Sequence, residues 1–299
     1  MDLTQLEYFV AVAEERSFTK GAQRAQIVQS AASAAVARLE REFDQDLFLR
    51  SGRQIEITEA GRVMLGHARR ILGGVQAARD DLDTLRGGLR GVVTLGTSIA
   101  TGTIDLAAAL ATFHQRHPAV AVHLRLSLGP THDHLDRVLD GTFDAALLPF
   151  PPVIPAGITM DVITHSRLVL VCRPDHALSN AKHVRYRQLA DETFVDFPQG
   201  WGNRVFIDSL FDADRSPRTV AVEVNDVATA LALVSSGLGI AFVPEQFLGY
   251  QKELVAVDLL HPPATRTLGL AIAEHRPISA ATKALRNAIA NQAHQQQNA

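Results

Sequence analysis

Apolar residues recur at helical spacing near the start of the chain and predict three short helices. Over residues 3–15 they fall at every third or fourth position, which predicts the first helix. Ser17 and Thr19 are N-cap candidates for a second helix that continues to Ala25. A tight connection over residues 26–29 leads to the third helix. Two helices joined by about four residues are typical of a helix-turn-helix.

The third helix is expected to begin near Ser30 and to have two contrasting faces. Its buried stripe comprises Ala32, Val36, Leu39 and Phe43. Its outer face is small and then basic, and comprises Ser30, Ser33, Ala34, Ala37, Arg38 and Arg41. Such a face belongs either to an ordinary solvated helix or to a helix built to approach another molecule closely.

Two short strands are predicted next, over residues 47–49 and 54–57. The turn between them, residues 50–53, carries Arg50 and Arg53. This pattern predicts a β-hairpin wing beside the helix-turn-helix.

A long helix is predicted from Thr58 onward. Its apolar residues alternate between spacings of four and three, which is typical of a coiled-coil seam: Met64, Ala68, Ile71, Val75, Ala78, Leu82 and Leu85. The alternative is a helix that lies on the core of its own domain. Each of Gly73 and Gly74 weakens a helix by about 1 kcal/mol relative to alanine, so a bend is expected there.

A glycine-rich hinge over residues 86–91 separates this part from the rest of the chain. Beyond it, the pattern predicts strands at 92–95, 120–126, 145–148, 168–172, 193–195, 220–224, 240–243 and 268–273. Helices are predicted at 103–117, 132–139, 226–236 and 279–291. The alternation predicts α/β units with a mostly parallel sheet. The polar residues 294–299 are expected to form a disordered tail.

Composition narrows the class of protein. With 299 residues, 46% of them hydrophobic, the chain is long enough for two or three packed units. Every apolar run in the sequence is much shorter than the stretch of about 18 residues that a helix needs to span a bilayer. The N-terminus is not that of a signal peptide, and the single cysteine excludes an intramolecular disulfide, so a cytoplasmic location without membrane contact is expected.

Net charge gives little support for a polyanionic partner. The chain has a formal net charge of −3, and residues 1–90 hold 13 basic and 13 acidic residues. Any binding to nucleic acid must therefore depend on where individual charges lie.

The sequence contains no catalytic constellation, so no enzyme activity, metal or cofactor is expected. Gly237-Leu238-Gly239 begins like a dinucleotide-binding motif, but Phe242 replaces its third glycine and a strand follows, which favours a helix C-cap and turn. The segment His132-Asp133-His134 has metal-ligand residue types, but its spacing on a helix does not converge, which favours a solvated face. Cys172 lies in an apolar strand and is expected to be a buried small hydrophobe.

Residues 3–61 resemble the winged helix-turn-helix of LysR-type transcriptional regulators. The matching residues are Leu6, Phe9, Val10, Ala13, Ser17-Phe18-Thr19, Ala22, Ala25, Gln29, Ala31, Ser33, Leu39-Glu40, Leu47-Phe48, Arg50, Arg53 and Thr58-Glu59-Ala60-Gly61. Three later segments resemble the effector domain of that family: Cys172–His176, Asp196–Pro198, and Leu233–Ile240 with Pro244. The resemblance covers essentially the whole chain.

The resemblance implies a multidomain fold. A winged helix-turn-helix domain is expected at residues 1–58 and a linker helix, which pairs two subunits, at 59–88. An α/β effector domain similar to periplasmic binding proteins follows, with one subdomain at 91–163 and 267–293 and a second at 164–266. The chain is expected to cross between the subdomains near 162–165 and 264–268.

The resemblance also implies where DNA binds. The third helix would lie in the major groove, and small residues would let it approach the bases closely. The expected DNA-binding residues are Lys20, Gln29, Ser30, Ser33, Arg38, Arg50 and Arg53. This chain departs from the family at Ser30, where many members have proline and where serine is a better N-cap. It departs again at Ala34, where the loss of a basic or long polar residue removes an expected contact to DNA.

An effector is expected in the cleft between the subdomains, where strand ends and helix N-termini present hydroxyl and amide groups. The candidate residues are Thr97, Ser98, Thr101, Gly129, Thr131, Asp196, Gly200, Trp201 and Asn225. A polar ligand such as a carboxylate suits them. Trp201 is interpreted either as a pocket wall or as a packing residue beneath a loop.

The expected function is that of a DNA-binding transcriptional regulator whose promoter binding is modulated by a small-molecule effector. Its expected partners are double-stranded DNA, a polar effector, further copies of the chain in a dimer of dimers, and RNA polymerase. Two alternatives stay open. One is a solute-binding module with a degenerate DNA-binding head, and the other is an enzyme of the α/β cleft, which the missing catalytic constellation disfavours.

Overall fold

The computed structural model describes residues 1–51, 54–84, 88–97, 104–126, 129–181, 183–251, 253–260, 264–274, 276 and 278–297. The chain forms two compact units. The first unit comprises residues 1–89 with 139–142 and 275–280, and the second comprises the remainder. None of the described helices is long and apolar enough to cross a membrane.

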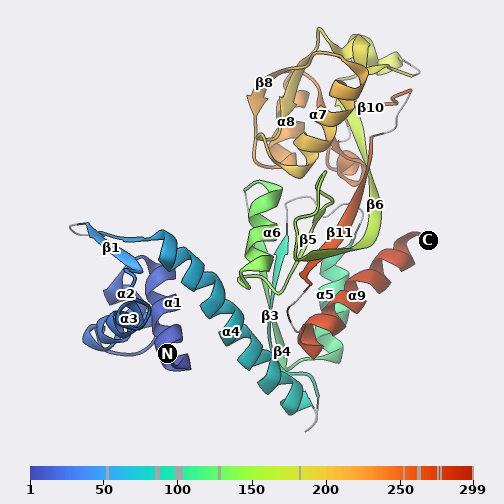
Figure 1. Ribbon diagram of the computed structural model, residues 1–299. Helices are drawn as coiled ribbons and strands as arrows, with labels where there is room; N and C mark the ends of the chain where they lie inside the picture. Colours follow the sequence, from blue (N-terminus) through green and yellow to red (C-terminus); the bar gives the residue numbers. More distant parts are fainter. Residues whose placement is uncertain are drawn as a thin grey trace. The chain divides into compact units, whose positions relative to one another are not determined.

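The first unit begins with three short helices: α1 (Leu3–Glu15), α2 (Phe18–Arg24) and α3 (Gln29–Phe43) (Figure 1). The hairpin strands β1 (Phe48–Ser51) and β2 (Gln54–Ile57) follow, and then the long helix α4 (Glu59–Thr84). The two strands are antiparallel. The predicted helix-turn-helix, hairpin and long helix are therefore confirmed.

Helix caps explain where α1 and α2 begin. The Asp2 carboxylate accepts from the backbone N–H of Gln5, whose side chain in turn accepts from the Asp2 backbone, forming a capping box. The hydroxyl of Ser17 accepts from the backbone N–H of Lys20, as predicted for an N-cap.

Helix α3 begins at Gln29, one residue before the expected start near Ser30, but the N-cap differs from the expected one. The N-cap residue is Val28, which makes no side-chain hydrogen bond. Ser30 therefore lies inside the first turn and is not the N-cap. The expected buried stripe is also shorter, because Phe43 is 42% exposed at the end of the helix, whereas Ala32, Val36 and Leu39 are buried.

An apolar core joins α1, α2, α3, β1 and the first half of α4. The Phe48 ring of β1 contacts the rings of Phe9 at 5.5 Å and Phe18 at 5.7 Å, measured between ring centroids. Ala68 of α4 is fully buried in the same cluster, and Met64 packs against it. The hairpin and α4 are thereby fixed to the three helices.

The predicted coiled-coil seam of α4 divides into two parts. Its first part, Met64 and Ala68, packs on the core of its own unit. Farther along the continuous helix, Ile71, Ala78 and Leu82 are exposed. Leu85 lies outside the described residues.

The second unit contains most of the strands: β3 (Gly91–Thr97), β4 (Val120–Leu126), β5 (Ala145–Pro149), β6 (Ile158–Cys172), β7 (Thr193–Asp196), β8 (Thr219–Glu223), β9 (Ala241–Pro244), β10 (Val255–Val257) and β11 (Thr265–Ala273). Its α-helices are α5 (Leu106–Arg116), α6 (Thr131–Leu139), α7 (Gly202–Asp214), α8 (Val227–Ser235) and α9 (Ala280–Gln297). Short 3₁₀ helices cover Ala177–Asn180, Tyr186–Leu189 and Glu245–Tyr250.

The main sheet has the strand order β10-β6-β11-β5-β3-β4, with β9 also paired to β6. Strand β3 is parallel to β4 and β5, but β11 is antiparallel to both β5 and β6. The prediction of a mostly parallel sheet is therefore wrong. Periodicity along each strand reports which residues are buried and carries no information about strand direction.

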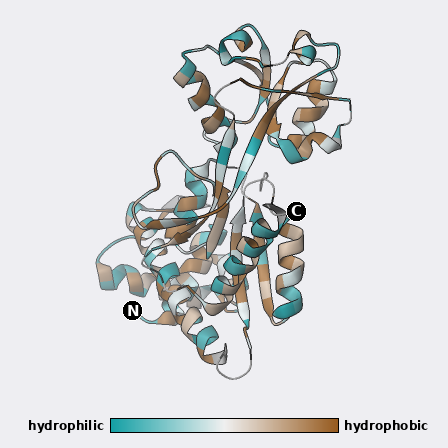
Figure 2. Cartoon of the chain, turned by 90° about the vertical axis from the view of Figure 1, so that its right-hand side faces the viewer, coloured by the Kyte–Doolittle hydropathy of each residue, from teal (hydrophilic) through white to brown (hydrophobic). Residues whose placement is uncertain are grey.

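Two lobes share the long strand β6. Its residues 158–167 pair with β11, whereas residues 168–172 pair with β9 and β10. The first lobe contains β3, β4, β5, α5, α6 and α9, and the second contains β7 to β10 with α7 and α8 (Figure 1). Apolar residues line the strands of both lobes, while their helices carry polar residues outward (Figure 2).

The expected disordered tail is wrong over residues 294–297, because α9 continues to Gln297. Ile289 and Ala293 are buried, so the helix packs on the first lobe beyond its predicted end. The polar composition of this segment reflects only its outward face.

The predicted burial of Cys172 is confirmed. The side chain is fully buried in β6, and burial raises the pKa of its thiol to about 11. The turn after α8 also matches its interpretation, because Gly237 and Gly239 both have positive φ.

Gly239 is the position where this turn most requires glycine. Its φ is +142°, and an added Cβ would lie 2.2 Å from the carbonyl oxygen of Thr193. We expect Gly239→Ala to lower the free energy of unfolding by about 1–3 kcal/mol, since strain and overlap add. Urea denaturation followed by circular dichroism measures the change. The control is Gly249→Ala, where an added Cβ meets nothing within 4 Å; an equal loss in both variants would contradict the explanation.

Candidate functional site

The outward face of α3 is the first candidate surface. Gln29, Ser30, Ala34 and Arg38 are exposed, and Ser33 is half-buried. The Gln29 side-chain amide donates to the Ser33 hydroxyl at 3.0 Å, which orders the first turn of this face. Because its side chains are small, the backbone of α3 lies close to the molecular surface.

Two cations lie at this surface without an acidic partner. Lys20 on α2 and Arg38 on α3 are exposed and form no ion pair within the described part of the chain. Arg24, by contrast, pairs with Glu14 at 2.6 Å. Of the two predicted wing arginines, Arg50 lies in β1, and Arg53 lies outside the described residues.

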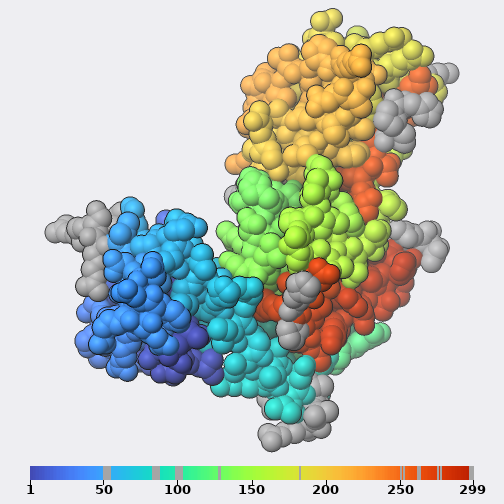
Figure 3. All heavy atoms as spheres, viewed as in Figure 1, coloured from blue at the N-terminus to red at the C-terminus, as the bar shows by residue number. Residues whose placement is uncertain are grey.

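The second candidate site is a cavity of about 360 Å³ in the second unit. Residues of the first lobe line one side: Thr131, His132, Phe150, Pro151 and Pro152. Residues of the second lobe line the other: Gly200, Gly202, Val205, Phe206 and Ser209. The lining is mainly apolar, with a few polar groups from both lobes, as in most small-molecule sites. In Figure 3 the first lobe is teal, green and red, and the second lobe is mainly yellow and orange.

Glycines let the two lobes approach each other beside this cavity. The Thr131 backbone N–H donates to the Gly200 carbonyl oxygen at 3.2 Å, which joins the start of α6 to the loop before α7. An added Cβ at Gly202 would lie 2.9 Å from Pro149 Cγ. Larger residues at these positions would hold the lobes apart.

Several of the expected effector residues lie at or near this cavity. Thr131 and Gly200 line it. Thr97 is buried at the end of β3, and Gly129 lies two residues before Thr131. Ser98 and Thr101 are outside the described residues.

Asp196, Trp201 and Asn225 are not among the residues that line the cavity. The Trp201 ring stacks on Phe197, with ring centroids 6.2 Å apart and an interplanar angle of 7°, and it packs against the core of the second lobe. This contact favours the interpretation of Trp201 as a packing residue.

The expected solvated face at residues 132–134 is wrong for His134. This side chain is 2% exposed, and its Nε2 lies 3.2 Å from the Thr97 carbonyl oxygen. His132 is exposed and lines the cavity. The helix α6 thus turns one histidine inward and one outward, because residues two apart on a helix lie on different faces.

The sequence interpretation missed the apolar part of the lining. Phe150, Pro151 and Pro152 follow β5, and Val205 and Phe206 belong to α7, a helix that was not predicted. The proline cluster after residue 148 was a usable signal for a loop at a strand end, where ligand sites lie in α/β folds.

Asp196 belongs to a buried ion-pair network and not to the cavity lining. Arg218 hydrogen-bonds to both Asp196 and Asp208. Arg204 donates to Asp208 at 2.8 Å and to the Phe197 carbonyl oxygen at 3.1 Å. Burial raises the pKa of Asp196, and the neighbouring arginines oppose that rise. The network fixes the end of β7, from which the loop to Gly200 departs.

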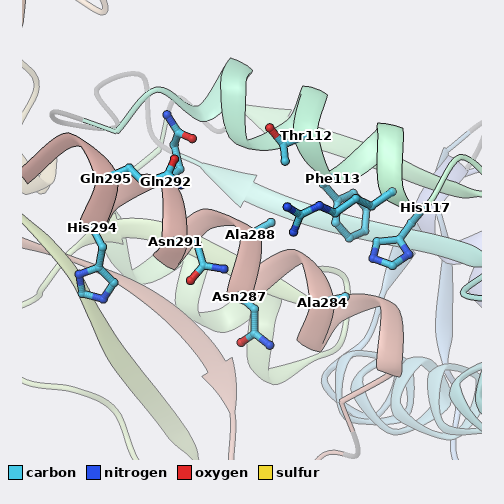
Figure 4. A pocket seen from close by; sticks show the side chains of 11 residues that line it. Thr112, Phe113, His117, Ala284, Asn287, Ala288, Asn291, Gln292, His294 and Gln295 are labelled. Atoms are coloured by element: carbon cyan, nitrogen blue, oxygen red, sulfur yellow. The ribbon is translucent and has the colours of Figure 1, made fainter. Parts of the chain in front are cut away.

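A third feature is an open groove of about 480 Å³ between α5 and α9 (Figure 4). Amide side chains of α9 line it, namely Asn287, Asn291, Gln292 and Gln295, opposite Thr112 and His117 from the other side. It lies between two helices and away from the strand ends that carry the other cavity.

Comparison with known proteins identifies the class. A family model described as "Bacterial regulatory helix-turn-helix protein, lysR family" matches residues 3–62, and one described as "LysR substrate binding domain" matches residues 86–294. The chain therefore belongs to the LysR family. It is a DNA-binding transcriptional regulator with an effector-binding domain, and not an enzyme.

Two curated relatives match over almost their whole length. The chain is similar to the HTH-type transcriptional regulator ShiR of Corynebacterium glutamicum (strain R), at 33% identity over 97% of this chain and 92% of ShiR. It is also similar to the uncharacterized regulator YnfL of Escherichia coli (strain K12), at 31% identity over 97% of this chain and 98% of YnfL.

Solved structures share the fold at lower identity. A full-length OxyR variant from Pseudomonas aeruginosa has a TM-score of 0.78 at 22% identity and covers 97% of this chain and 98% of OxyR. Full-length CbnR complexed with its target DNA has a TM-score of 0.64 at 22% identity, covering 98% of this chain and all of CbnR. The effector-binding domain of QuiR in complex with shikimate has a TM-score of 0.62 at 22% identity, covering 69% of this chain and 98% of QuiR.

The ion-pair network around Asp196 is expected to stabilise the loop that leads from β7 to Gly200 at the cavity, and a substitution can test this. We expect Arg218→Leu to lower the free energy of unfolding by about 3–5 kcal/mol, because it leaves the buried Asp196 carboxylate without its closest cation. Urea denaturation measures the loss. In the control, Arg167→Leu, an exposed arginine loses its ion pairs with Glu245 and Asp258, and a change of only about 0–1 kcal/mol is expected. Similar losses in both variants would contradict the structural role of the network.

Proposed function

We propose that α3 reads the major groove of a promoter through Gln29, Ser30, Ser33 and Arg38, while Lys20 and the wing arginines Arg50 and Arg53 contact the DNA backbone. The observation that carries this proposal is the exposed face of α3, small at its start and basic at Arg38, with no carboxylate paired to Lys20 or Arg38 in the described structure. Small side chains allow close approach to base edges, and unpaired cations can neutralise phosphates. The likeness in fold to the DNA-bound CbnR supports the same assignment.

A DNase footprint of the purified chain tests this function. The DNA is the intergenic region beside its own gene, and sheared genomic DNA serves as a second substrate. Protection of a periodic site that weakens as salt rises is the expected result. Absence of protection at low salt on both substrates would favour the alternative, a solute-binding module with a degenerate head.

Ala34 gives a gain-of-function test of the groove-reading face. Its side chain is exposed on α3, between Ser30 and Arg38 on the same face. We expect Ala34→Arg to tighten DNA binding at low salt and to steepen the plot of log K against log salt by about 0.9, the contribution of one added phosphate contact. Fluorescence anisotropy titrations on the footprinted site provide both quantities.

The matched control is Ala107→Arg, which adds the same charge to an exposed position of α5. It should leave the slope unchanged. If the two variants behave alike, net charge and not the position of residue 34 determines binding, and the proposed face is incorrect.

The cavity between the two lobes is the proposed effector site. Its volume of about 360 Å³ suits a small molecule, and Thr131, His132 and Ser209 place polar side chains among apolar ones. QuiR, which shares the fold of this region, binds shikimate. A polar effector that bridges the lobes would change their separation, because the Thr131–Gly200 hydrogen bond joins them directly. This change would be transmitted to DNA binding.

We place the lobes at residues 91–163 with 267–293 and at 164–266, following the DNA-binding domain at 1–58 and the linker helix at 59–88. The change of strand partners along β6 supports the boundary between the lobes.

As a transcriptional regulator, the chain would act in the cytoplasm, with RNA polymerase as a further partner.

The exposed half of the α4 seam supports a dimer through this helix, and a dimer of dimers on DNA. Leu82 is 62% exposed and follows Ile71 and Ala78 along one helix face. We expect Leu82→Asp to shift the protein to a smaller assembly, because a carboxylate in the seam opposes its partner helix. Sedimentation velocity across a range of concentrations measures the assembly.

The control for this test is Val63→Asp. Val63 is an exposed apolar residue of the same helix that lies outside the seam. Its substitution should leave the assembly intact. Dissociation by both variants, or by neither, would be inconsistent with pairing along the seam.

A further inference from the structure

Two short segments from later in the sequence, residues 139–142 and 275–280, belong to the first compact unit. Both contain residues that lie close to helix α4. An added Cβ at Gly141 would lie 3.8 Å from the backbone carbonyl carbon of Arg69 and 3.0 Å from Nη1 of Arg276. At Gly73 of α4, an added Cβ would lie 2.7 Å from Nη2 of Arg276. Glycine at these two positions therefore lets the turn and the guanidinium approach the helix closely.

The face of α4 that meets these segments is distinct from the predicted coiled-coil seam. Arg69, Gly73, Gln76 and Asp80 follow one another at spacings of four, three and four, so they share one side of the helix. At 3.6 residues per turn, this side lies roughly 150° around the helix from the seam. The Gln76 amide donates to the Asp80 carboxylate at 2.8 Å, and Asp80 is buried. Helix α4 can therefore contact these segments and a partner helix at the same time.

Arg69 joins this face of α4 to the three-helix part of the DNA-binding head. Its Nε and Nη2 donate to Oε1 of Glu14, at the end of α1, at 3.1 and 2.9 Å. Its Nη1 donates to Oδ2 of Asp140. The other carboxylate oxygen of Glu14 pairs with Arg24 of α2 at 2.6 Å. The Arg69 side chain is only 18% exposed, so salt screens its two ion pairs less than pairs on the open surface.

Asp140 directly follows helix α6, whose first residue, Thr131, lines the cavity. The second carboxylate oxygen of Asp140 accepts from the backbone N–H of Thr142 at 2.8 Å, which orders the turn after α6. A second contact to α4 lies at the start of α9, where the Asp81 carboxylate accepts from the backbone N–H of Ala280 at 3.1 Å. One end of α6 and one end of α9 are thus tied to α4.

We propose that Arg69 is a positioning residue of the DNA-binding head, which transmits a displacement of the turn after α6 to helix α1. The inference rests on the proposed effector cavity, at which α6 begins, and names the connection from that helix to the head. A guanidinium has donors fixed in one plane, so it can hold two carboxylates in a defined geometry. When Asp140 shifts, the guanidinium shifts with it, and Glu14 follows.

Hydrogen–deuterium exchange of the full-length chain, without DNA or ligand, tests this connection. Asp140→Asn keeps the size of the side chain and removes its charge. We expect amide exchange to rise about three- to tenfold in the turn itself and also at the end of α1, residues 12–16, because a guanidinium held from one side is less ordered for its other partner. Amides of α3, which packs in the same core, should change less than about twofold.

Arg69→Lys distinguishes a connection from two separate local contacts. Lysine keeps the charge, but its ammonium is a point charge on a flexible stem and does not hold two carboxylates in a fixed geometry. When Asp140→Asn is added to Arg69→Lys, exchange at the end of α1 should therefore change less than about twofold. In the otherwise unmodified chain, Glu14→Gln should raise exchange in the turn after α6, since Arg69 lies between the two carboxylates.

The matched control is Glu59→Gln, which also removes one carboxylate from an arginine of α4. Glu59 pairs with Arg62 at 2.6 Å, and both side chains are exposed. Exchange at the end of α1 and in the turn after α6 should change less than about twofold in this variant, because an exposed ion pair contributes little.

Three results would each overturn the role of Arg69. They are a rise in exchange confined to the turn in Asp140→Asn, an equal rise in α1 and α3, and an undiminished effect of Asp140→Asn in the Arg69→Lys background. An equal rise in α1 and α3 would indicate a general loss of stability. Neither DNA nor effector takes part in the measurement, so a failed footprint would count against the proposed function and leave this result standing. A salt-dependent footprint together with exchange confined to the turn would refute only the connection.

Discussion

The antiparallel pairing of β6 with β11 is the constraint on which the second unit depends. These strands pair over residues 158–167 and 265–273, with an irregularity in register between Leu268 and Gly269. On the first-lobe side, β11 also pairs with β5, and beyond the pairing β6 continues to β9 and β10. Strands β6 and β11 therefore connect the two lobes. Any change in the separation of the lobes must be absorbed where these two strands pass from one lobe to the other.

In the first unit, the main constraint is that helix α3 must present its outward face to a partner outside the protein. The unit's core aromatic contacts, centred on Phe48, fix the hairpin against α1 and α2. The outward face of α3 carries the small residues Ser30, Ser33 and Ala34 ahead of Arg38. A balanced net charge means that attraction over long distances contributes little, since local cations and not the total charge face the partner. Recognition by this unit therefore depends on close fit to a greater extent than in a strongly basic domain.

Periodicity in the sequence predicted the elements that have one clear apolar stripe. The prediction failed where contacts between residues distant in the sequence determine the structure. Helices α1 and α2, the hairpin and α4 follow from periodicity and caps, which are local properties. Strand directions in the main sheet depend on the chain returning through β11, which no window of the sequence contains. The helix α7 was missed because Gly202 and Asn203 at its start resemble a loop, and its apolar residues face both a core and a cavity.

Candidate site residues, like the elements of the fold, were predictable only where the signal is local in the sequence. Thr131 and Gly200 were predicted as effector residues because strand ends and helix starts are local signals, and both line the cavity. Asp196 has a similar sequence context, yet Arg218, 22 residues later, occupies its carboxylate. Three arginines of this unit make the general point: Arg167 is exposed and paired, Arg218 is buried and shared between two carboxylates, and Arg266 is buried beside an amide. Their residue type is identical, so what each one does is determined by the partners that the fold brings to it.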